Sequence, residues 1–178
     1  MNFSIIKGWA HKRWALDLQG SNPNSTAIIA KIAPLSERSS LMSQRKVWRW
    51  LLAQLPIKCI DSNDPVEPDS FDLDHFLPWS FVCHDQYWNL IPANSAVSRS
   101  VRRTLPTLEQ VEAFIIIQTL VLQVAQRMVP SKQWASVAED YRAGLGLSTA
   151  ELVNGDKVAV AYTETLRPMI SLAQSLGY

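Results

Sequence analysis

The sequence predicts an α+β protein, with a small centre of short strands and loops inside a mainly α-helical body. Apolar residues recur at helical spacing in the first and last thirds of the chain, whereas the stretch between Pro56 and Pro92 is rich in turns and aromatic residues. Because 47% of the 178 residues are apolar and seven are tryptophan, a substantial core can form. We expect an N-terminal helical segment over 1–56, a mixed core over 57–106 and a C-terminal helical segment over 107–178.

The N-terminal segment is predicted to consist of helices separated by turns. Apolar residues at positions 5, 6, 9 and 10 have helical spacing, and the turn-forming run 20–24 ends that helix. Ser25 is a candidate cap for a short helix to residue 32. Apolar positions again recur at helical spacing over 39–55, and a proline ends this helix.

The mixed core is predicted to hold short strands joined by loops. Residues 57–60 and 71–73 are short runs of strand-forming character, and residues 61–70 between them are rich in turn formers. After Pro92, a short helix is predicted that ends near Arg103.

The helix that opens the C-terminal segment has a strong start signal, because Thr107 and Gln110 have the spacing of a capping box. The helix should end near Met128. Its residues are apolar almost all round, which predicts that it is buried centrally.

Further helices are predicted after residue 130. Ser131 opens one that Gly144 and Gly146 end, and Ser148 with Glu151 forms a second capping box that opens another, which Asn154-Gly155 stops. A last helix is expected around 158–176, bent near Pro168.

The charge balance does not by itself indicate a nucleic-acid-binding protein, since the formal net charge is +1. The basic residues nevertheless form local groups. We interpret the first two as solvated helix faces, whereas the third lies beside the motif described below. The groups are Lys12 and Arg13; Arg45, Lys46 and Arg49; and Arg99, Arg102 and Arg103.

Cysteine content and hydropathy favour a cytoplasmic protein that does not associate with a membrane. Two cysteines cannot build a disulfide framework or a four-cysteine zinc site. Charged residues interrupt the region 1–16 where a signal peptide would need an apolar run. The most apolar stretch, 113–129, contains three glutamines and an arginine, which makes it too short and too polar for a membrane span.

Asp74 and His75 are adjacent and lie at the end of a predicted strand. Side chains alternate along a strand, so the carboxylate and the imidazole should point in different directions. The carboxylate can then hold a divalent ion while the histidine takes a proton from water. This combination suits phosphodiester hydrolysis.

The surrounding residues resemble the HNH (His-Asn-His) endonuclease family over about Lys58 to Pro106. The resemblance rests on Asp74-His75, Leu77-Pro78-Trp79, Trp88-Asn89-Leu90-Ile91-Pro92 and Leu105-Pro106. It implies a ββα-metal core, in which a two-stranded hairpin and a helix surround one metal ion. It also implies that Asp74 is a metal ligand, that His75 is the general base, and that Asn89 braces the loop and the base.

One position departs from the family pattern. Where the family has a second metal ligand, His or Asn, this chain has Ser98, whose hydroxyl is a weaker ligand. Asn94 precedes Ser98 by one helical turn and would share its face of the predicted helix, so its amide oxygen is a candidate replacement. A second possibility is that Ser98 binds the ion through a water, and a third is that Asn94 only caps that helix. Arg99, Arg102 and Arg103 follow directly and are expected to contact backbone phosphates.

Other residues near the motif have two interpretations each. His84-Asp85, between its two halves, either assists phosphate binding or stabilises the loop through a hydrogen bond to the backbone. Trp79, Trp88 and Trp134 either stack on bases or belong to the core, and the core is favoured.

The favoured function is therefore a metal-dependent HNH-type endonuclease that hydrolyses phosphodiester bonds in nucleic acid, with DNA favoured over RNA. Mg²⁺ or Mn²⁺ is the expected ion, with Ni²⁺ and Zn²⁺ as alternatives. The competing hypothesis is a catalytically lapsed module that binds nucleic acid or docks on a protein partner as a subunit of a larger complex. Ser98 favours the lapsed module, whereas Asp74, His75 and Asn89 favour the enzyme.

Overall fold

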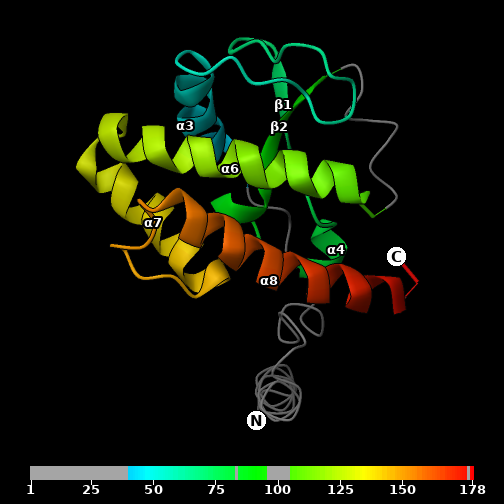
Figure 1. The fold of residues 1–178 in the computed structure, drawn as a ribbon. Helices are drawn as coiled ribbons and strands as arrows, with labels where there is room; N and C mark the ends of the chain where they lie inside the picture. Colours follow the sequence, from blue (N-terminus) through cyan, green and yellow to red (C-terminus); the bar gives the residue numbers. More distant parts are fainter. Residues whose placement is uncertain (1–39, 83, 96–104, 176) are drawn as a thin grey trace, which may run out of the picture. The chain divides into compact units, whose positions relative to one another are not determined.

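The computed structural model describes residues 40–82, 84–95, 105–175 and 177–178 (Figure 1). These fall into two compact units: residues 41–77 with 85–178, and residues 78–84 with residue 40. The smaller unit contains the four-residue helix α4 (Trp79–Val82). The helices predicted before residue 33 lie outside the described residues. The predicted α+β fold class is confirmed, because the larger unit combines helices with a two-stranded sheet.

Helix α3 (Met42–Leu52) confirms the helix predicted over 39–55. Its buried face consists of Val47, Trp48, Leu51 and Leu52. Arg45 is more than a solvated charge. Its guanidinium lies 4.9 Å from the centre of the Phe71 ring, donates to the Phe71 carbonyl and forms a 3.4 Å ion pair with Asp72. The helix is therefore tied to the first strand by packing and charge together.

Strands β1 (Phe71–His75) and β2 (Leu90–Asn94) form an antiparallel pair. Phe71 is opposite Asn94, and His75 is opposite Leu90. The helix predicted from Pro92 to about Arg103 does not start directly after Pro92, because β2 continues through Pro92 to Asn94. Most of the predicted helix lies outside the described residues. In a two-stranded sheet each strand is an edge, and an edge strand tolerates the missing N–H of proline.

Helix α6 (Leu108–Met128) begins with the predicted capping box. The Thr107 N–H donates to Gln110 Oε1 at 2.9 Å, and the Gln110 N–H donates to Thr107 Oγ1 at 3.3 Å. The prediction of central burial is wrong, since Ile116 is 60% exposed and Leu120 is 48% exposed. Only one face of the helix is buried, and it includes Phe114.

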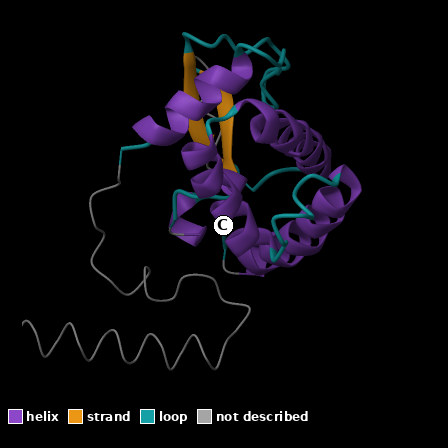
Figure 2. Ribbon diagram, turned by 90° about the vertical axis from the view of Figure 1, so that its left-hand side faces the viewer, coloured by secondary structure: helices purple, strands orange, loops and turns teal. Residues whose placement is uncertain are grey.

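Length and composition alone would allow α6 to cross a membrane, and it is the only helix of the described residues that would. The core helix of a soluble protein passes the same test. The helix packs against α8 (Gly155–Ser175) within the larger unit (Figure 1). Figure 2 shows the two strands of this unit side by side among the helices.

Helix α7 (Ser131–Leu145) ends at Gly146, which adopts the left-handed conformation with φ +68°. Gly144, predicted to end the helix, lies inside it. A Cβ atom on Gly144 would stand 2.2 Å from Nε1 of the Trp88 indole, so the glycine is needed for close approach.

The helix predicted from Ser148 does not form, and residues 149–153 are turns. Glu151 accepts from both the N–H and the hydroxyl of Ser148, at 3.0 and 2.7 Å, which closes a local turn. The stop predicted at Asn154-Gly155 is instead the start of α8, because the Asn154 side chain accepts from the Lys157 N–H at 3.1 Å. Pro168 lies inside α8.

Aromatic rings join the end of β1 to the C-terminal helices. Phe76 stacks on Phe114 of α6 with 3.8 Å between the ring centres and 8° between their planes. Phe114 meets Tyr162 of α8 edge to face at 5.6 Å, and Tyr141 of α7 meets Tyr162 at 6.5 Å. The sheet is thus anchored to the helical body directly beside the residues of the motif.

Candidate active site

Asp74 and His75 are the last two residues of β1 and are partly buried. The register places Asp74 opposite Ile91 and His75 opposite Leu90. Because side chains alternate along the strand, the carboxylate and the imidazole leave on opposite faces. The strand end that the sequence predicted for this pair is confirmed.

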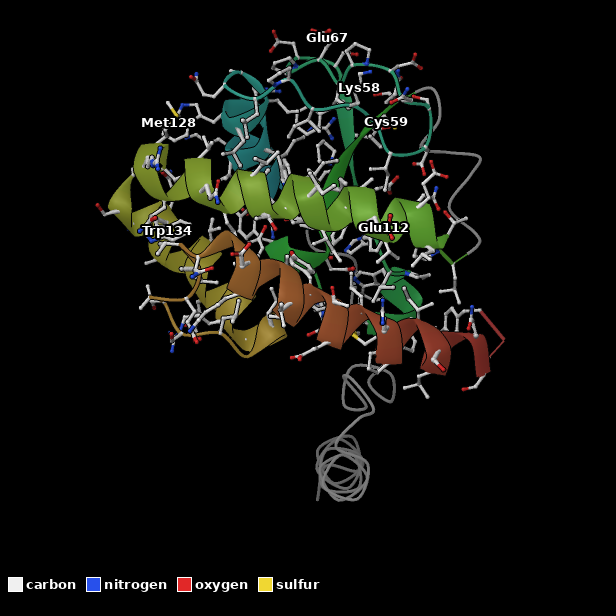
Figure 3. All side chains as sticks on the ribbon, in the orientation of Figure 1. Lys58, Cys59, Glu67, Glu112, Met128 and Trp134 are labelled. Carbon is white, nitrogen blue, oxygen red and sulfur yellow. The ribbon has the colours of Figure 1, made fainter. Side chains whose placement is uncertain are left out.

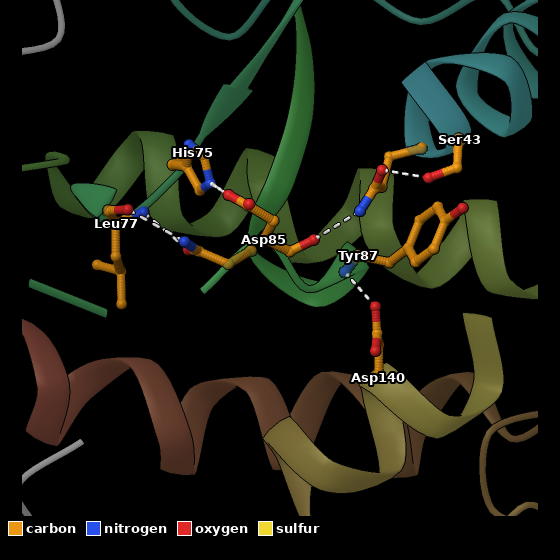
Figure 4. Close-up of polar contacts among 8 residues, drawn as sticks. Ser43, His75, Leu77, Asp85, Tyr87 and Asp140 are labelled. Atoms are coloured by element: carbon orange, nitrogen blue, oxygen red, sulfur yellow. Dashed lines mark hydrogen bonds and ion pairs between the residues drawn. The ribbon is translucent and has the colours of Figure 1, made fainter. Parts of the chain in front are cut away.

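His75 is paired with a carboxylate that the sequence did not point to. Its Nε2 lies 2.9 Å from Oδ1 of Asp85, and the two side chains are 12% and 17% exposed (Figure 4). The two interpretations of His84-Asp85 were phosphate binding and a backbone hydrogen bond, and neither describes this contact. Asp85 lies in an irregular connection without periodicity, so the only signal was a carboxylate close in sequence to a candidate base.

The Asp85 backbone is itself held in place. Its carbonyl accepts from the side-chain amide of Gln44 in α3 at 3.1 Å. Two residues on, the Tyr87 N–H donates to Asp140 of α7 at 3.0 Å (Figure 4). Burial raises the pKa of Asp140, although the Tyr87 N–H partly counters that effect, and burial with the Asp140 charge raises the pKa of Tyr87 to about 12.

Asn89 is fully buried and forms a reciprocal pair with the backbone of Leu77. Its Oδ1 accepts from the Leu77 N–H at 2.8 Å, and its Nδ2 donates to the Leu77 carbonyl at 3.0 Å. The Asn89 carbonyl also accepts from the Phe76 N–H at 2.7 Å. The geometry is that of a brace on the two residues that follow His75.

Three helices each make one hydrogen bond to the segment formed by the short 3₁₀ helix η1 (Tyr87–Asn89) and the first residue of β2. The Tyr87 bond to α7 was given above. Tyr162 of α8 donates to the Trp88 carbonyl at 2.9 Å, and Gln118 of α6 donates to the Leu90 carbonyl at 2.7 Å. Trp88 is 2% exposed and packs on Gly144, which confirms it as core.

Asn94 does not join Asp74. It ends β2 and lies three residues beyond Ile91, the partner of Asp74. Three strand residues span about 10 Å and an odd number of steps changes the face, so the two side chains lie apart on opposite faces. As Asn94 lies in a strand, it does not share a helix face with Ser98. Ser98, Arg99, Arg102 and Arg103 lie outside the described residues.

The described residues offer oxygen donors of the kind that suit a hard, hydrated cation. Across residues 40–82, 84–95, 105–175 and 177–178, no three His, Cys, Asp or Glu side chains form a group that could hold a metal. The buried Cys59 lies in the segment between α3 and β1 and forms no disulfide (Figure 3). Mg²⁺ needs only one or two protein carboxylates, because it retains several waters. The Asp74 carboxylate is an oxygen donor of the kind that such an ion uses.

Comparison with known proteins informs the central part of the chain. Residues 58–106 match the family model described as HNH endonuclease. No curated protein and no solved structure matches the chain. The matched segment includes Asp74, His75, Asp85 and Asn89, and a match to this family suggests nuclease function. The resemblance to the HNH endonuclease family is thereby confirmed for residues 58–106 of this chain.

Proposed function

We propose that this protein is a metal-dependent endonuclease that hydrolyses phosphodiester bonds in nucleic acid, with DNA as the favoured substrate. The observation that carries the proposal is the position of Asp74 and His75 at one strand end, within the segment that matches the HNH family. Asn89 braces the backbone directly after this pair through both atoms of its side-chain amide.

In this proposal His75 is the general base that takes a proton from the attacking water. The imidazole is 12% exposed, so it is largely shielded but still reaches the surface. Asn89 keeps the loop after β1 in one conformation, which limits the movement of His75 relative to the substrate. A misplaced base would lose much of the advantage that comes from a fixed geometry.

Asp74 is the proposed protein ligand of Mg²⁺ or Mn²⁺, which suit an oxygen-rich site, and Ni²⁺ is an alternative. When bound, the ion supplies charge stabilisation to the phosphate and to the leaving oxygen. Zn²⁺ is a further alternative, although it is bound mostly by nitrogen and sulfur ligands, whereas Asp74 offers oxygen.

Substrate binding must depend on local charge, since the formal net charge is only +1. Arg99, Arg102 and Arg103 follow Ser98 closely in the sequence. We propose that they contact backbone phosphates. Such contacts favour no base sequence, so they would support binding without giving specificity.

The direct test is nicking and linearisation of plasmid DNA by the purified chain with Mg²⁺, Mn²⁺ or Ni²⁺. His75→Ala should lower the rate about 10²–10⁴-fold, as expected for the loss of a general base, while leaving circular dichroism unchanged. His11→Ala is the matched control, because this histidine belongs to no motif. Equal cleavage by His75→Ala and the parent chain would refute the assignment.

The second candidate is a lapsed HNH module that binds nucleic acid or a protein partner. Ser98 favours it, because it stands where the family has a stronger metal ligand. Ser98→Asn separates the two candidates. If the parent chain is inactive with every ion and Ser98→Asn cleaves DNA, the site is a lapsed nuclease. If the parent chain cleaves DNA, the lapsed module is excluded.

A further inference from the structure

We propose that Asp85 is a positioning residue for His75, one that holds the imidazole by Nε2 and fixes which ring nitrogen carries the lone pair. The proposal rests on the proposed function of His75 as a base. Its structural basis is the 2.9 Å contact between His75 Nε2 and Asp85 Oδ1.

The chemistry of the contact determines the tautomer. An ionised carboxylate only accepts hydrogen bonds, so Nε2 must carry the proton that it donates. In the neutral ring the lone pair is then on Nδ1, which becomes the basic nitrogen. A carboxylate at the far nitrogen also fixes the orientation of an imidazole ring.

The surroundings of Asp85 indicate a built arrangement. The Gln44 side chain of α3 holds the Asp85 carbonyl at 3.1 Å, and Asp140 of α7 holds the Tyr87 N–H at 3.0 Å (Figure 4). Between them, Gln86 accepts from the indole N–H of Trp88 at 2.6 Å. The backbone is thus held at Asp85 itself and two residues after it, so little conformational entropy is lost when the Asp85 carboxylate meets the imidazole.

A purely structural ion pair is the alternative explanation. Exposed pairs contribute little to stability, and mostly buried pairs lose much of their attraction to desolvation. The Asp85 and His75 side chains are only 17% and 12% exposed, so net stabilisation does not account well for the pair. If Asp85 instead orients the proposed base, both observations are explained: a carboxylate lies next to His75, and it contacts Nε2 of the ring.

The experiment compares the parent chain with Asp85→Ala and Asp85→Glu in plasmid cleavage. Loss of a carboxylate behind an imidazole typically costs about 10–100-fold in activity, so we expect that decrease in kcat for Asp85→Ala with KM unchanged. Asp85→Glu should recover part of kcat. Asp69→Asn is the matched control, since this carboxylate is 97% exposed and should leave kcat unchanged.

A second readout does not depend on activity. Imidazole ¹⁵N signals of His75 should show one tautomer with a protonated Nε2 in the parent chain, and should move toward exchanging tautomers in Asp85→Ala. Unchanged signals together with unchanged kcat would overturn the positioning role. If the parent chain proves inactive, the proposed function fails by the cleavage assay, while the ¹⁵N signals still test whether Asp85 fixes the ring.

Discussion

Asn89→Ala should be among the most destabilising substitutions in the matched segment. The Asn89 side chain is fully buried and satisfies two backbone groups of Leu77, its N–H at 2.8 Å and its carbonyl at 3.0 Å. Leu77 is itself fully buried. Alanine removes both partners and supplies none, so two polar groups would be left in the interior.

The size of the effect follows from the cost of an unsatisfied buried group, about 1–3 kcal/mol each. Two such groups give a loss of about 2–6 kcal/mol in the free energy of unfolding. That is a large part of the roughly 5–15 kcal/mol that holds a typical domain together.

Urea unfolding, followed by tryptophan fluorescence, measures this loss. Asn154→Ala is the matched control, because the Asn154 side-chain amide accepts one hydrogen bond at the exposed start of α8. A lost helix cap should cost about 1 kcal/mol. If Asn89→Ala destabilised the protein no more than Asn154→Ala, the brace at Leu77 would contribute nothing beyond an ordinary cap and the reasoning would be refuted.

Three other substitutions test separate features. Gly144→Ala would place a Cβ atom 2.2 Å from the rigid Trp88 indole. Overpacking of this kind should lower the free energy of unfolding, measured in urea, by at least roughly 1–3 kcal/mol. An unchanged free energy of unfolding would contradict the close approach. Asp140→Asn removes a carboxyl whose pKa burial raises. Because the pKa of Asp140 is higher in the folded than in the unfolded state, the folded protein gains stability as the pH falls from the folded pKa toward the unfolded value of 3.8. Over this pH range the free energy of unfolding of the parent chain should rise relative to that of the variant. A difference between the two proteins that does not depend on pH would refute this. Ile116→Lys changes a side chain that is 60% exposed, so the free energy of unfolding in urea should change by less than about 0.5 kcal/mol, whereas a larger loss would show that this face of α6 is covered.

The sequence predicted the elements whose signals are local. The capping box at Thr107 and Gln110, the helix within 39–55 and the strand that ends at His75 all formed as expected. In each case the signal and its effect lie within a few residues, so neighbouring parts of the fold could not easily override them.

Predictions that depended on distant residues failed. Gly144 was predicted to end a helix, but its lack of a side chain instead allows the Trp88 indole, far away in the sequence, to pack against it. Because α6 is apolar almost all round, the sequence predicted that every face of it would be buried. Leu120 is nevertheless 48% exposed, since only one side of the helix is covered. Proximity in sequence alone did not identify Asp85 as the partner of His75, because only the path of the irregular connection brings the two side chains together.

The hydrogen bonds from α6, α7 and α8 to Leu90, Tyr87 and Trp88 have a consequence for protein engineering. All three helices begin after residue 106, where the match to the HNH family ends. A graft of residues 58–106 into another scaffold would transfer the motif but leave its supports behind. Any minimal fragment should therefore extend through Ser175, and fusion partners belong after the last helix.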